Sequence, residues 1–243
     1  DATVSKSFIN IILQTYNDID VGRMDELFEC VRRNLNHPAV VAVYDLSELD
    51  LVDLPIDIRF HRKYMRIKHT TGRMKYADAL ELANAMPNEY WALVNCDIYL
   101  SSASDWTAII PELDKGVVYC QSRHEHDSSE MDTEFAPLLW CNTQDAWVFK
   151  SPLAIPPAKI QFFLGVLGCD NAIAHRVVAY ARRPVINKPV TYKIMHMDKV
   201  RGKNATNFTE FHKKKNIDSL PNPAGEGYFF VPNRDDPRTN NID

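Results

Sequence analysis

Apolar and polar positions alternate along the chain in a way that predicts strands and helices in turn. The apolar run at 8–15 is rich in β-branched residues and predicts a buried strand. Residues 22–36 carry apolar side chains at helical spacing, and the sequence Asn36-His37-Pro38 ends that helix. A second apolar run, 40–44, ends at Asp45. A strand, a helix and a strand with short connections predict a parallel βαβ unit.

The central stretch, 90–100, is an apolar run interrupted by Asn95 and Asp97. We interpret it as a buried strand that brings these two side chains to its carboxyl end, where ligands bind in open α/β sheets. A strand followed by an ordinary turn that contains Asp is the alternative interpretation. A helix at 75–86 precedes this stretch, and a further strand is expected near 56–60.

The later part of the chain continues the same pattern. We expect a strand at 116–121, a further apolar segment within 142–149, and candidate strands at 185–190 and 192–197. A Pro-rich loop is expected at 151–157 and a helix at 170–181. Beyond about residue 200, Lys, Asn and Pro dominate. The prediction is an α/β fold with a central, mostly parallel sheet flanked by helices. It forms one domain over 1–200, and 201–243 form a loosely packed or partly disordered tail.

Composition narrows the class of protein. A chain of 243 residues with 45% hydrophobic residues can bury a large core without disulfide or metal staples. The net charge of -4 argues against a nucleic-acid partner. The five cysteines are widely spaced and odd in number, which favours reduced, buried thiols. No apolar run reaches the ~18 residues of a transmembrane segment.

One segment is strongly basic. Between 58 and 77 there are seven Lys or Arg residues and no Asp or Glu. It is interpreted either as a solvated loop or as an electropositive wall for a diphosphate. Arg73 is the candidate for the second role, because it stands just before a helix whose N-terminus favours anions. Asp78 lies one turn into that helix.

Several polar residues stand beside apolar segments. His196 ends a late apolar strand and is either a satisfied structural group or a metal or phosphate ligand. The cluster 124–127 (His-Glu-His-Asp) resembles a metal site, but its polar surroundings favour an exposed loop. Gln144-Asp145 and Asp170 are either caps and turns or groups that face a sugar and an acceptor hydroxyl.

Together these pieces resemble a group of GT-A glycosyltransferases found in bacteria and in large DNA viruses of algae. The resemblance spans roughly residues 8–197, and the elements at 144–147 and 168–171 are its most specific parts. The matching elements are Gln14-Thr15-Tyr16-Asn17-Asp18, Gly72-Arg73-Met74-x-Tyr76-x-Asp78-Ala79, Asn95-x-Asp97-Ile98-Tyr99, Thr143-Gln144-Asp145-Ala146-Trp147-Val148-Phe149 and Gly168-Cys169-Asp170-Asn171.

The resemblance implies a GT-A (Rossmann-like) fold and a set of roles. Thr15 and Tyr16 would line the nucleotide base pocket, and Asp45 would end a strand at the nucleoside site. Arg73, followed by Asp78, would approach the ribose or diphosphate. Asp97 would be the metal ligand of an Asp-x-Asp element, with His196 as a late metal or phosphate ligand. The sugar and acceptor side would hold Gln144, Asp145 and Asp170.

This chain has Asn95 where the common pattern has Asp, so Asn95 is expected to bind metal weakly, through water, or to contact the sugar. The expected cofactor is Mn²⁺ (or Mg²⁺), which would stabilise the charge on a leaving diphosphate. Asp170 or Asp145 would then deprotonate the acceptor hydroxyl, giving inversion, or stabilise an oxocarbenium-like sugar, giving retention. The expected reaction moves a sugar from a UDP-sugar to a hydroxyl of an oligosaccharide or glycoconjugate.

The sequence also suggests three alternative functions to compare with a glycosyltransferase. A nucleotidyltransferase would have a Gly-rich, Arg-containing loop after the first strand, whereas here the first glycine is Gly22. An inactive nucleotide- or carbohydrate-binding module of the same fold is the main alternative, and a purely structural, partner-binding domain is the third. We expect a cytoplasmic protein. The missing initial Met and two glycosylation sequons, at 204–206 and 207–209, keep an excised catalytic domain of the secretory lumen as the alternative.

Overall fold

The structure is a computed structural model that describes residues 7–69, 71–126, 143–166, 168–202, 227 and 229–235. Its elements follow in this order: β1 (Ile9–Leu13), α1 (Val21–Asn36), β2 (Val40–Ser47), η1 (Leu51–Asp53), α2 (Ile56–Arg59), β3 (Tyr64–Lys68), α3 (Tyr76–Asn84), β4 (Tyr90–Val94), β5 (Ile98–Leu100), η2 (Trp106–Ile109), α4 (Ile110–Asp114), β6 (Val118–Gln121), β7 (Arg123–Glu125), β8 (Ala146–Lys150), η3 (Pro157–Lys159), α6 (Cys169–Arg176), η4 (Val177–Ala181), β9 (Val185–Ile186), β10 (Ile194–His196) and α7 (Lys199–Gly202).

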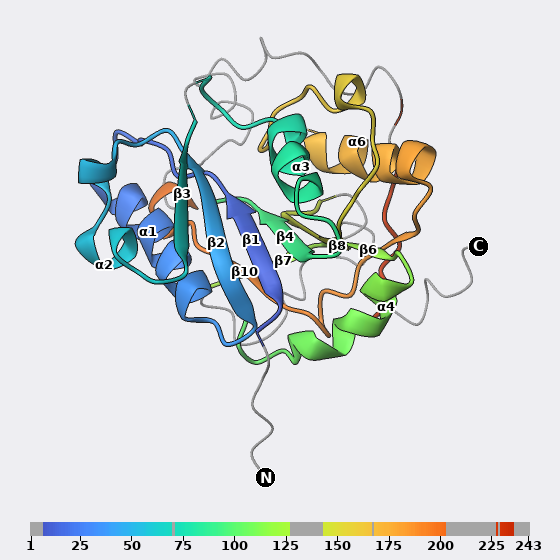
Figure 1. Cartoon of the computed structure of the whole chain (residues 1–243). Helices are drawn as coiled ribbons and strands as arrows, with labels where there is room; N and C mark the ends of the chain where they lie inside the picture. The colour runs from blue at the N-terminus through green and yellow to red at the C-terminus, as the bar shows by residue number, and fades with distance from the viewer. Residues whose placement is uncertain are drawn as a thin grey trace.

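A seven-stranded sheet with the order β3-β2-β1-β4-β8-β6-β9 forms the centre of the molecule (Figure 1). The first four strands in this order are parallel, β8 is antiparallel to both of its neighbours, and β6 and β9 are parallel. The predicted α/β fold with a mostly parallel, helix-flanked sheet is therefore confirmed.

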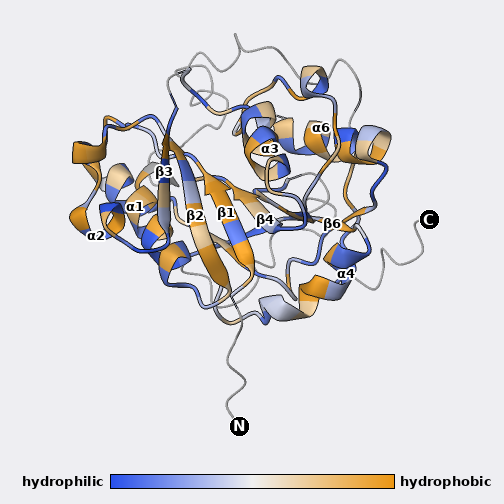
Figure 2. Cartoon of the chain, viewed as in Figure 1, coloured by the Kyte–Doolittle hydropathy of each residue, from blue (hydrophilic) through white to orange (hydrophobic). Residues whose placement is uncertain are grey.

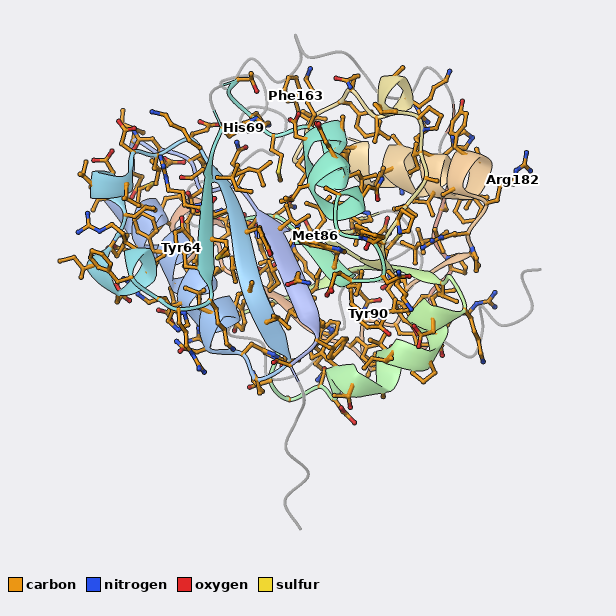
Figure 3. The ribbon with its side chains drawn as sticks, viewed as in Figure 1. Tyr64, His69, Met86, Tyr90, Phe163 and Arg182 are labelled. Carbon is orange, nitrogen blue, oxygen red and sulfur yellow. The ribbon has the colours of Figure 1, made fainter. Side chains whose placement is uncertain are left out.

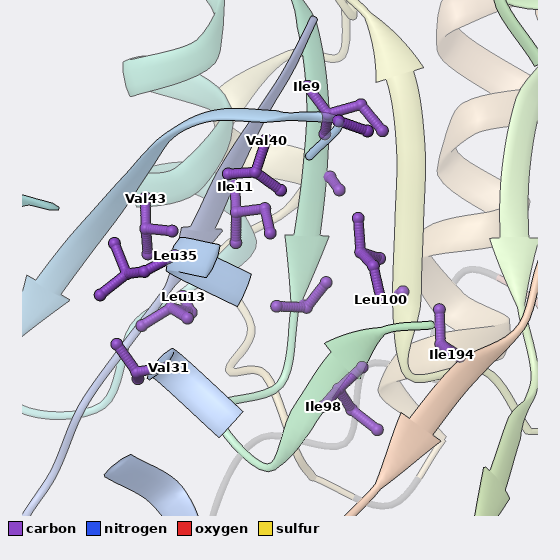
Figure 4. Close-up of a cluster of buried hydrophobic side chains, with 14 of the residues drawn as sticks. Ile9, Ile11, Leu13, Val31, Leu35, Val40, Val43, Ile98, Leu100 and Ile194 are labelled. Atoms are coloured by element: carbon purple, nitrogen blue, oxygen red, sulfur yellow. The ribbon is translucent and has the colours of Figure 1, made fainter. Parts of the chain in front are cut away.

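Alternation along β1 divides the core between the two faces of the sheet. Ile9, Ile11 and Leu13 pack with apolar side chains of α1, as Figure 4 shows for Val31 and Leu35. On the opposite face, Ile12 packs with side chains of α3 and α6 in a second cluster. A strand buried on both faces needs a nearly continuous apolar sequence, and this explains the composition of 8–13.

A small second sheet has the order β5-β10-β7. β10 is antiparallel to β5, with His196 opposite Ile98, and parallel to β7, with His196 opposite Glu125. Because β5 follows β4 after only three residues, this pairing brings the end of β10 next to the end of β4.

One predicted strand is wrong. Residues 56–60 form the short helix α2 and its C-cap rather than a strand, and the third strand of the βαβ region is β3. The apolar residues Ile56, Ile58 and Phe60 alternate with polar ones, and this pattern imitates a strand. In the helix only Ile58 is buried, whereas Ile56 and Phe60 point to solvent.

Most other elements confirm the sequence prediction. The helix predicted at 170–181 appears as α6, continued by the π-helical turn η4. Cys30, Cys96, Cys120 and Cys169 are free and buried. No helix in the described ranges is long and apolar enough to span a bilayer.

Much of the predicted tail lies outside the described residues, so its loose packing stays a prediction. The described piece 229–235 lies along the end of β9. Asn187 donates its backbone N–H to Pro232 and accepts one from Arg234, and Val231 is buried. This contact adds a short segment to the far edge of the large sheet.

Candidate functional site

Strand direction explains why polar side chains from distant parts of the sequence meet. The parallel strands β1, β2 and β4 all end at the same edge of the sheet. β8 runs the other way, so its first residues lie at that edge too, with Ala146 opposite Val94. The residues that follow β1, β2 and β4 therefore lie at the same edge as those that precede β8.

Asp97 and His196 face each other at this edge. Asp97 Oδ2 lies 3.4 Å from His196 Nε2, and the Met197 N–H donates to the backbone oxygen of Asp97 at 2.9 Å. The antiparallel pairing of β5 and β10 fixes this arrangement. The sequence prediction placed both residues at strand ends, and the structure brings their side chains together.

His196 is held on its other nitrogen by a second carboxylate. Nδ1 lies 3.1 Å from Glu125 Oε2, a residue of β7. Burial by itself would lower the pKa of His196, but Asp97 and Glu125 outweigh it and raise the pKa to about 9. A carboxylate on the far nitrogen also fixes the ring orientation, and this is the usual environment of a metal-binding histidine.

Arg23, in the first turn of α1, is the buried cation of this region. Its guanidinium donates to Asp97 Oδ2 at 2.5 Å and to Glu26 Oε2 at 3.0 Å, and its Nη1 lies 3.5 Å from Asp198 Oδ1. Burial would lower the pKa of Arg23, but Asp97 and the other negative neighbours raise it above its ordinary value. Arg23 therefore keeps its charge and holds Asp97 in one orientation.

Glu26 joins the same network to the chain after β10. Its Oε1 accepts the backbone N–H groups of Lys199 and Val200, at 2.8 and 3.1 Å, in the first turn of α7. Arg23 also donates to the backbone oxygen of Met197 at 2.5 Å. Helix α1 is thus fastened to the segment that carries His196, and the geometry of the Asp97–His196 pair is set before any ligand binds.

Asn95 contacts Asp145 rather than Asp97. Asn95 Nδ2 donates to Asp145 Oδ1 at 2.8 Å, and Arg123 Nη1 donates to Asp145 Oδ2 at 2.9 Å. A carboxylate at position 95 would place two negative charges at this distance, and the amide instead supplies a donor. Asn95, which stands in place of the first Asp of the Asp-x-Asp pattern, therefore suits its neighbour Asp145 in charge and in hydrogen bonding.

Gln144 and Asp170 form a further pair. The backbone N–H of Gln144 donates to Asp170 Oδ2 at 3.0 Å, and Asp170 lies in the first turn of α6. Burial raises the pKa of Asp170 to about 6, although the hydrogen bond from Gln144 acts in the opposite direction. Next to it, Asn171 is buried, and its Nδ2 has no hydrogen-bond partner within the described ranges.

Thr15 and Asp45 form a closed, buried unit at the ends of β1 and β2. Asp45 accepts the Thr15 N–H at 2.8 Å, the Thr15 hydroxyl at 2.7 Å and the Tyr64 hydroxyl at 2.6 Å. Asp45 is 0% exposed, and burial raises its pKa. Both residues lie at the predicted edge, but Asp45 is enclosed by protein, whereas Tyr16 next to Thr15 is half-buried.

Gln14 clamps the segment that carries Arg73 against the end of β1. Gln14 donates to the Gly72 carbonyl at 3.0 Å and accepts the Met74 N–H at 2.6 Å. Arg73 lies between these anchors, and its Nη1 is buried without a hydrogen-bond partner among the described residues. Asp78 accepts the Lys75 N–H at 2.8 Å.

The carboxylate of Asp78 therefore caps the start of α3, and it also lies 3.6 Å from the His69 ring. Figure 3 shows His69 at the end of β3 that lies toward this region, with Phe163 beside the start of α3.

Sequence reasoning missed Arg23, Arg123 and Glu125. Arg23 stands at a helical position that suits a solvated residue, and its partner Asp97 is 74 residues away. The exposed loop predicted at 124–127 is wrong for the described part: residues 123–125 form β7, and His124 is buried with its Nε2 2.7 Å from the Pro189 oxygen. The pattern that could have revealed β7 was the alternation of a strand, because His124 and Glu125 point to opposite sides. Asp127 lies outside the described residues.

Among the residues that the structure describes, no three His, Cys, Asp or Glu side chains form a group that could hold a metal ion alone. Asp97 and His196 provide a pair of donors. Mg²⁺ and similar hard cations keep several waters at phosphate sites and need few protein carboxylates. The pair, with Glu125 behind His196, fits such a cation.

Neither a protein-family model nor a curated protein matches the sequence. A proposed nucleotide-diphospho-sugar transferase from Desulfovibrio desulfuricans is similar in structure, with 10% identity, a TM-score of 0.45, and coverage of 87% of this chain and 97% of that one. The 4-diphosphocytidyl-2C-methyl-D-erythritol synthase from Anaerococcus prevotii has 14% identity and a TM-score of 0.40, and the match covers 62% of this chain and 73% of that one. At these values the similarities do not assign an activity.

Proposed function

We propose that the chain is a metal-dependent glycosyltransferase that moves a sugar from a UDP-sugar to a hydroxyl of a glycan acceptor. The observation that carries the proposal is the Asp97–His196 pair, whose facing donor atoms lie 3.4 Å apart at the ligand-binding edge of the sheet. Glu125 on the far nitrogen of His196 and Arg23 on Asp97 support it, because they hold both donors in place.

In this proposal Asp97 and His196 hold Mn²⁺ or Mg²⁺, and the cation displaces the proton that His196 carries at its raised pKa. The cation supplies Lewis-acid stabilisation of the negative charge that grows on the leaving diphosphate. Arg73 adds a fixed positive charge on the same side, and its unpartnered Nη1 is a donor for a phosphate oxygen. The base pocket forms at Thr15 and Tyr16: the half-buried Tyr16 faces the base, and Thr15, itself buried against Asp45, fixes the chain behind it.

Asp170 is the proposed general base. Its pKa of about 6 leaves the carboxylate ionised at neutral pH and raises its basicity above that of an ordinary Asp. It takes the proton of the acceptor hydroxyl as the oxygen forms its bond to the anomeric carbon. The bond from that carbon to the diphosphate oxygen breaks with its electron pair, and the product is inverted. Asp145 is the weaker candidate, because Asn95 and Arg123 occupy both of its oxygens.

The melting temperature with UDP, GDP and CDP, each with and without Mn²⁺, tests the donor and the metal together. A ligand at 100 times its Kd stabilises the fold by about 2.7 kcal/mol, a shift of several degrees. We expect a shift with UDP that requires Mn²⁺, followed by turnover in a screen of UDP-sugars. The variant Asp97→Asn should lose the Mn²⁺-dependent shift. Asp25→Asn, on the exposed side of α1, is its control and should keep the shift.

The outcomes separate the alternatives. Binding of UDP and Mn²⁺ without turnover of any UDP-sugar would make the chain a binding module. A shift with another nucleotide would keep the reaction class and change the donor. If no nucleotide shifts the melting temperature, the proposed function fails.

A further inference from the structure

A patch of exposed apolar side chains lies beside the edge strand β3 and contains none of the candidate-site residues. It consists of Leu51 and Val52 of η1 and Ile56 and Phe60 on α2 and its C-cap, and we call it the η1–α2 patch. Val52, Ile56 and Phe60 are 78, 69 and 75% exposed. Figure 2 shows the two turns in orange at the outer margin of the molecule.

Helical geometry explains why Ile56 and Phe60 share one direction. Ile56 and Phe60 are four residues apart, so they lie on one side of the turn, and Ile58 on the other side is fully buried. Arg59 joins the two turns, because its Nη1 donates to the Leu51 carbonyl at 3.4 Å and its guanidinium lies over the Phe60 ring. The patch is therefore one built surface rather than scattered residues.

The surroundings of the patch are basic although the whole chain is acidic. Residues 50–68 hold five Lys or Arg and three Asp, a net charge of +2, against -4 for the chain. Two of the acidic side chains are already paired, Asp57 with Arg32 and Asp50 with Lys68. Asp53 is the third. The exposed Arg62 follows directly after the patch, with Arg59 within it.

We propose that the η1–α2 patch binds the surface of an anionic lipid bilayer. Protruding Ile and Phe side chains enter the boundary between head groups and acyl chains, while neighbouring Arg and Lys side chains contact anionic head groups. Exposed fractions of 69–78% describe side chains that stand out from the surface. Such a convex shape suits a deformable bilayer better than the flat, close-packed core of a protein interface.

This inference is independent of the proposed function, because it uses no residue of the candidate site. If both hold, the protein works at a membrane surface, where an acceptor attached to lipid would be available. A failure of either experiment leaves the other unaffected: vesicle binding is measured without nucleotide or metal, and the nucleotide experiments are done without lipid.

The test is co-sedimentation of the full chain with phosphatidylcholine vesicles, with and without added phosphatidylglycerol. One variant carries Ile56→Ser and Phe60→Ser, with Phe230→Ser as the control, because Phe230 is exposed outside the patch. A second variant carries Arg59→Gln and Arg62→Gln. Its control is Lys115→Gln with Arg182→Gln, two exposed residues; Figure 3 shows Arg182 on the side opposite α2.

We expect binding to the anionic vesicles that weakens with salt. The apolar variant should bind at least about tenfold more weakly. Loss of each Arg should weaken binding about fivefold. Both controls should bind like the unmodified protein.

The proposal is overturned if the chain does not sediment with anionic vesicles, or if the apolar variant binds as well as its control. Self-association that disappears in the apolar variant, without vesicle binding, would assign the patch to a second copy of the chain instead. Circular dichroism and melting temperature confirm that each variant is folded. All altered side chains except the half-buried Arg59 are exposed, so folding should be preserved.

Discussion

Asp45 and Asp97 lie near the same edge of the sheet, Asp45 in the last part of β2 and Asp97 three residues after β4, yet their surroundings differ. Asp45 is sealed in the protein, and its partners are neutral donors: the Thr15 N–H and hydroxyl and the Tyr64 hydroxyl. Asp97 is paired with charged groups, Arg23 and His196, and its side chain is 14% exposed. Position at a strand end is common to both, and the partners decide what each can do.

The neutral partners of Asp45 fill its hydrogen-bonding capacity and leave no surface for a ligand, so it acts on the fold and on the placement of Thr15. The charged partners of Asp97 hold it in place close to the surface. There its carboxylate, now paired with cationic side chains, can bind a metal ion instead. We therefore expect substitutions at Asp97 to affect activity most, and substitutions at Asp45 to affect stability most.

The largest expected effect is on turnover. Asp97→Asn should lower kcat by about a thousandfold or more, because the metal that offsets diphosphate charge loses an anionic ligand. Steady-state kinetics with the best UDP-sugar measures it, and Asp25→Asn is the control. An unchanged kcat would remove Asp97 from the metal site and end the contrast with Asp45.

The second prediction concerns Asp170. Asp170→Asn should lower kcat by about a hundredfold to ten-thousandfold. In the unmodified enzyme kcat should rise with pH through about 6, the pKa of Asp170, since the ionised form is the base. A pH profile shared by the Asn variant, or a change confined to the acceptor KM, would make Asp170 a binding group instead.

The same residue predicts a trend in stability. Its pKa in the fold, about 6, is above the ordinary 3.8, so the ionised carboxyl opposes folding. The free energy of unfolding should therefore fall as pH rises from about 4 to above 6, by up to about 3 kcal/mol. Urea unfolding of Asp170→Asn should not show this loss. Equal pH trends in both proteins would contradict the assigned burial of Asp170.

The fourth prediction completes the comparison from the Asp45 side. Asp45→Ala leaves the buried donors of Thr15 and Tyr64 unpaired, and the free energy of unfolding should fall by about 2–4 kcal/mol. At a temperature where the variant is folded, kcat should stay within about tenfold of the unmodified value. Urea unfolding measures the loss of stability, and steady-state kinetics measures kcat. A thousandfold loss of kcat without destabilisation would place Asp45 in the catalytic site.

The smallest expected effect is at the altered position of the Asp-x-Asp element. Asn95→Asp places a second carboxylate against Asp145 and should destabilise the fold by about 1–2 kcal/mol. Adding Asp145→Asn restores one donor and one acceptor, so the double variant should recover most of the loss. Unfolding of the two single variants and the double variant gives the coupling, and additive effects would mean that the pair does not interact.

The sequence predicted the parts of the fold that rest on local periodicity. The strands around 8–13 and 90–94 and the helices α1 and α3 have long or regular apolar patterns, and they were found where expected. Residues 56–60 were misjudged because Ile56, Ile58 and Phe60 alternate like a strand in what is one helical turn. The edge strand β3 was hidden because only Tyr64 among its residues is buried.

Of the candidate site, the sequence predicted only the residues that stand at the ends of apolar runs. Asp97 and His196 each ended an apolar run, and the antiparallel pairing of β5 with β10 then brings them together. Arg23 and Glu125 could not be found this way, since their importance comes from partners far away in the sequence, Asp97 for one and His196 for the other.

The most direct measurement is a calorimetric titration of UDP into the protein with and without Mn²⁺, repeated for Asp97→Asn and for Asp25→Asn. We expect UDP to bind tightly only with Mn²⁺. Asp97→Asn should lose this dependence together with most of the affinity, and Asp25→Asn should keep both. Mn²⁺-dependent binding of UDP that survives in Asp97→Asn would contradict the assignment of Asp97 and His196 as the metal site.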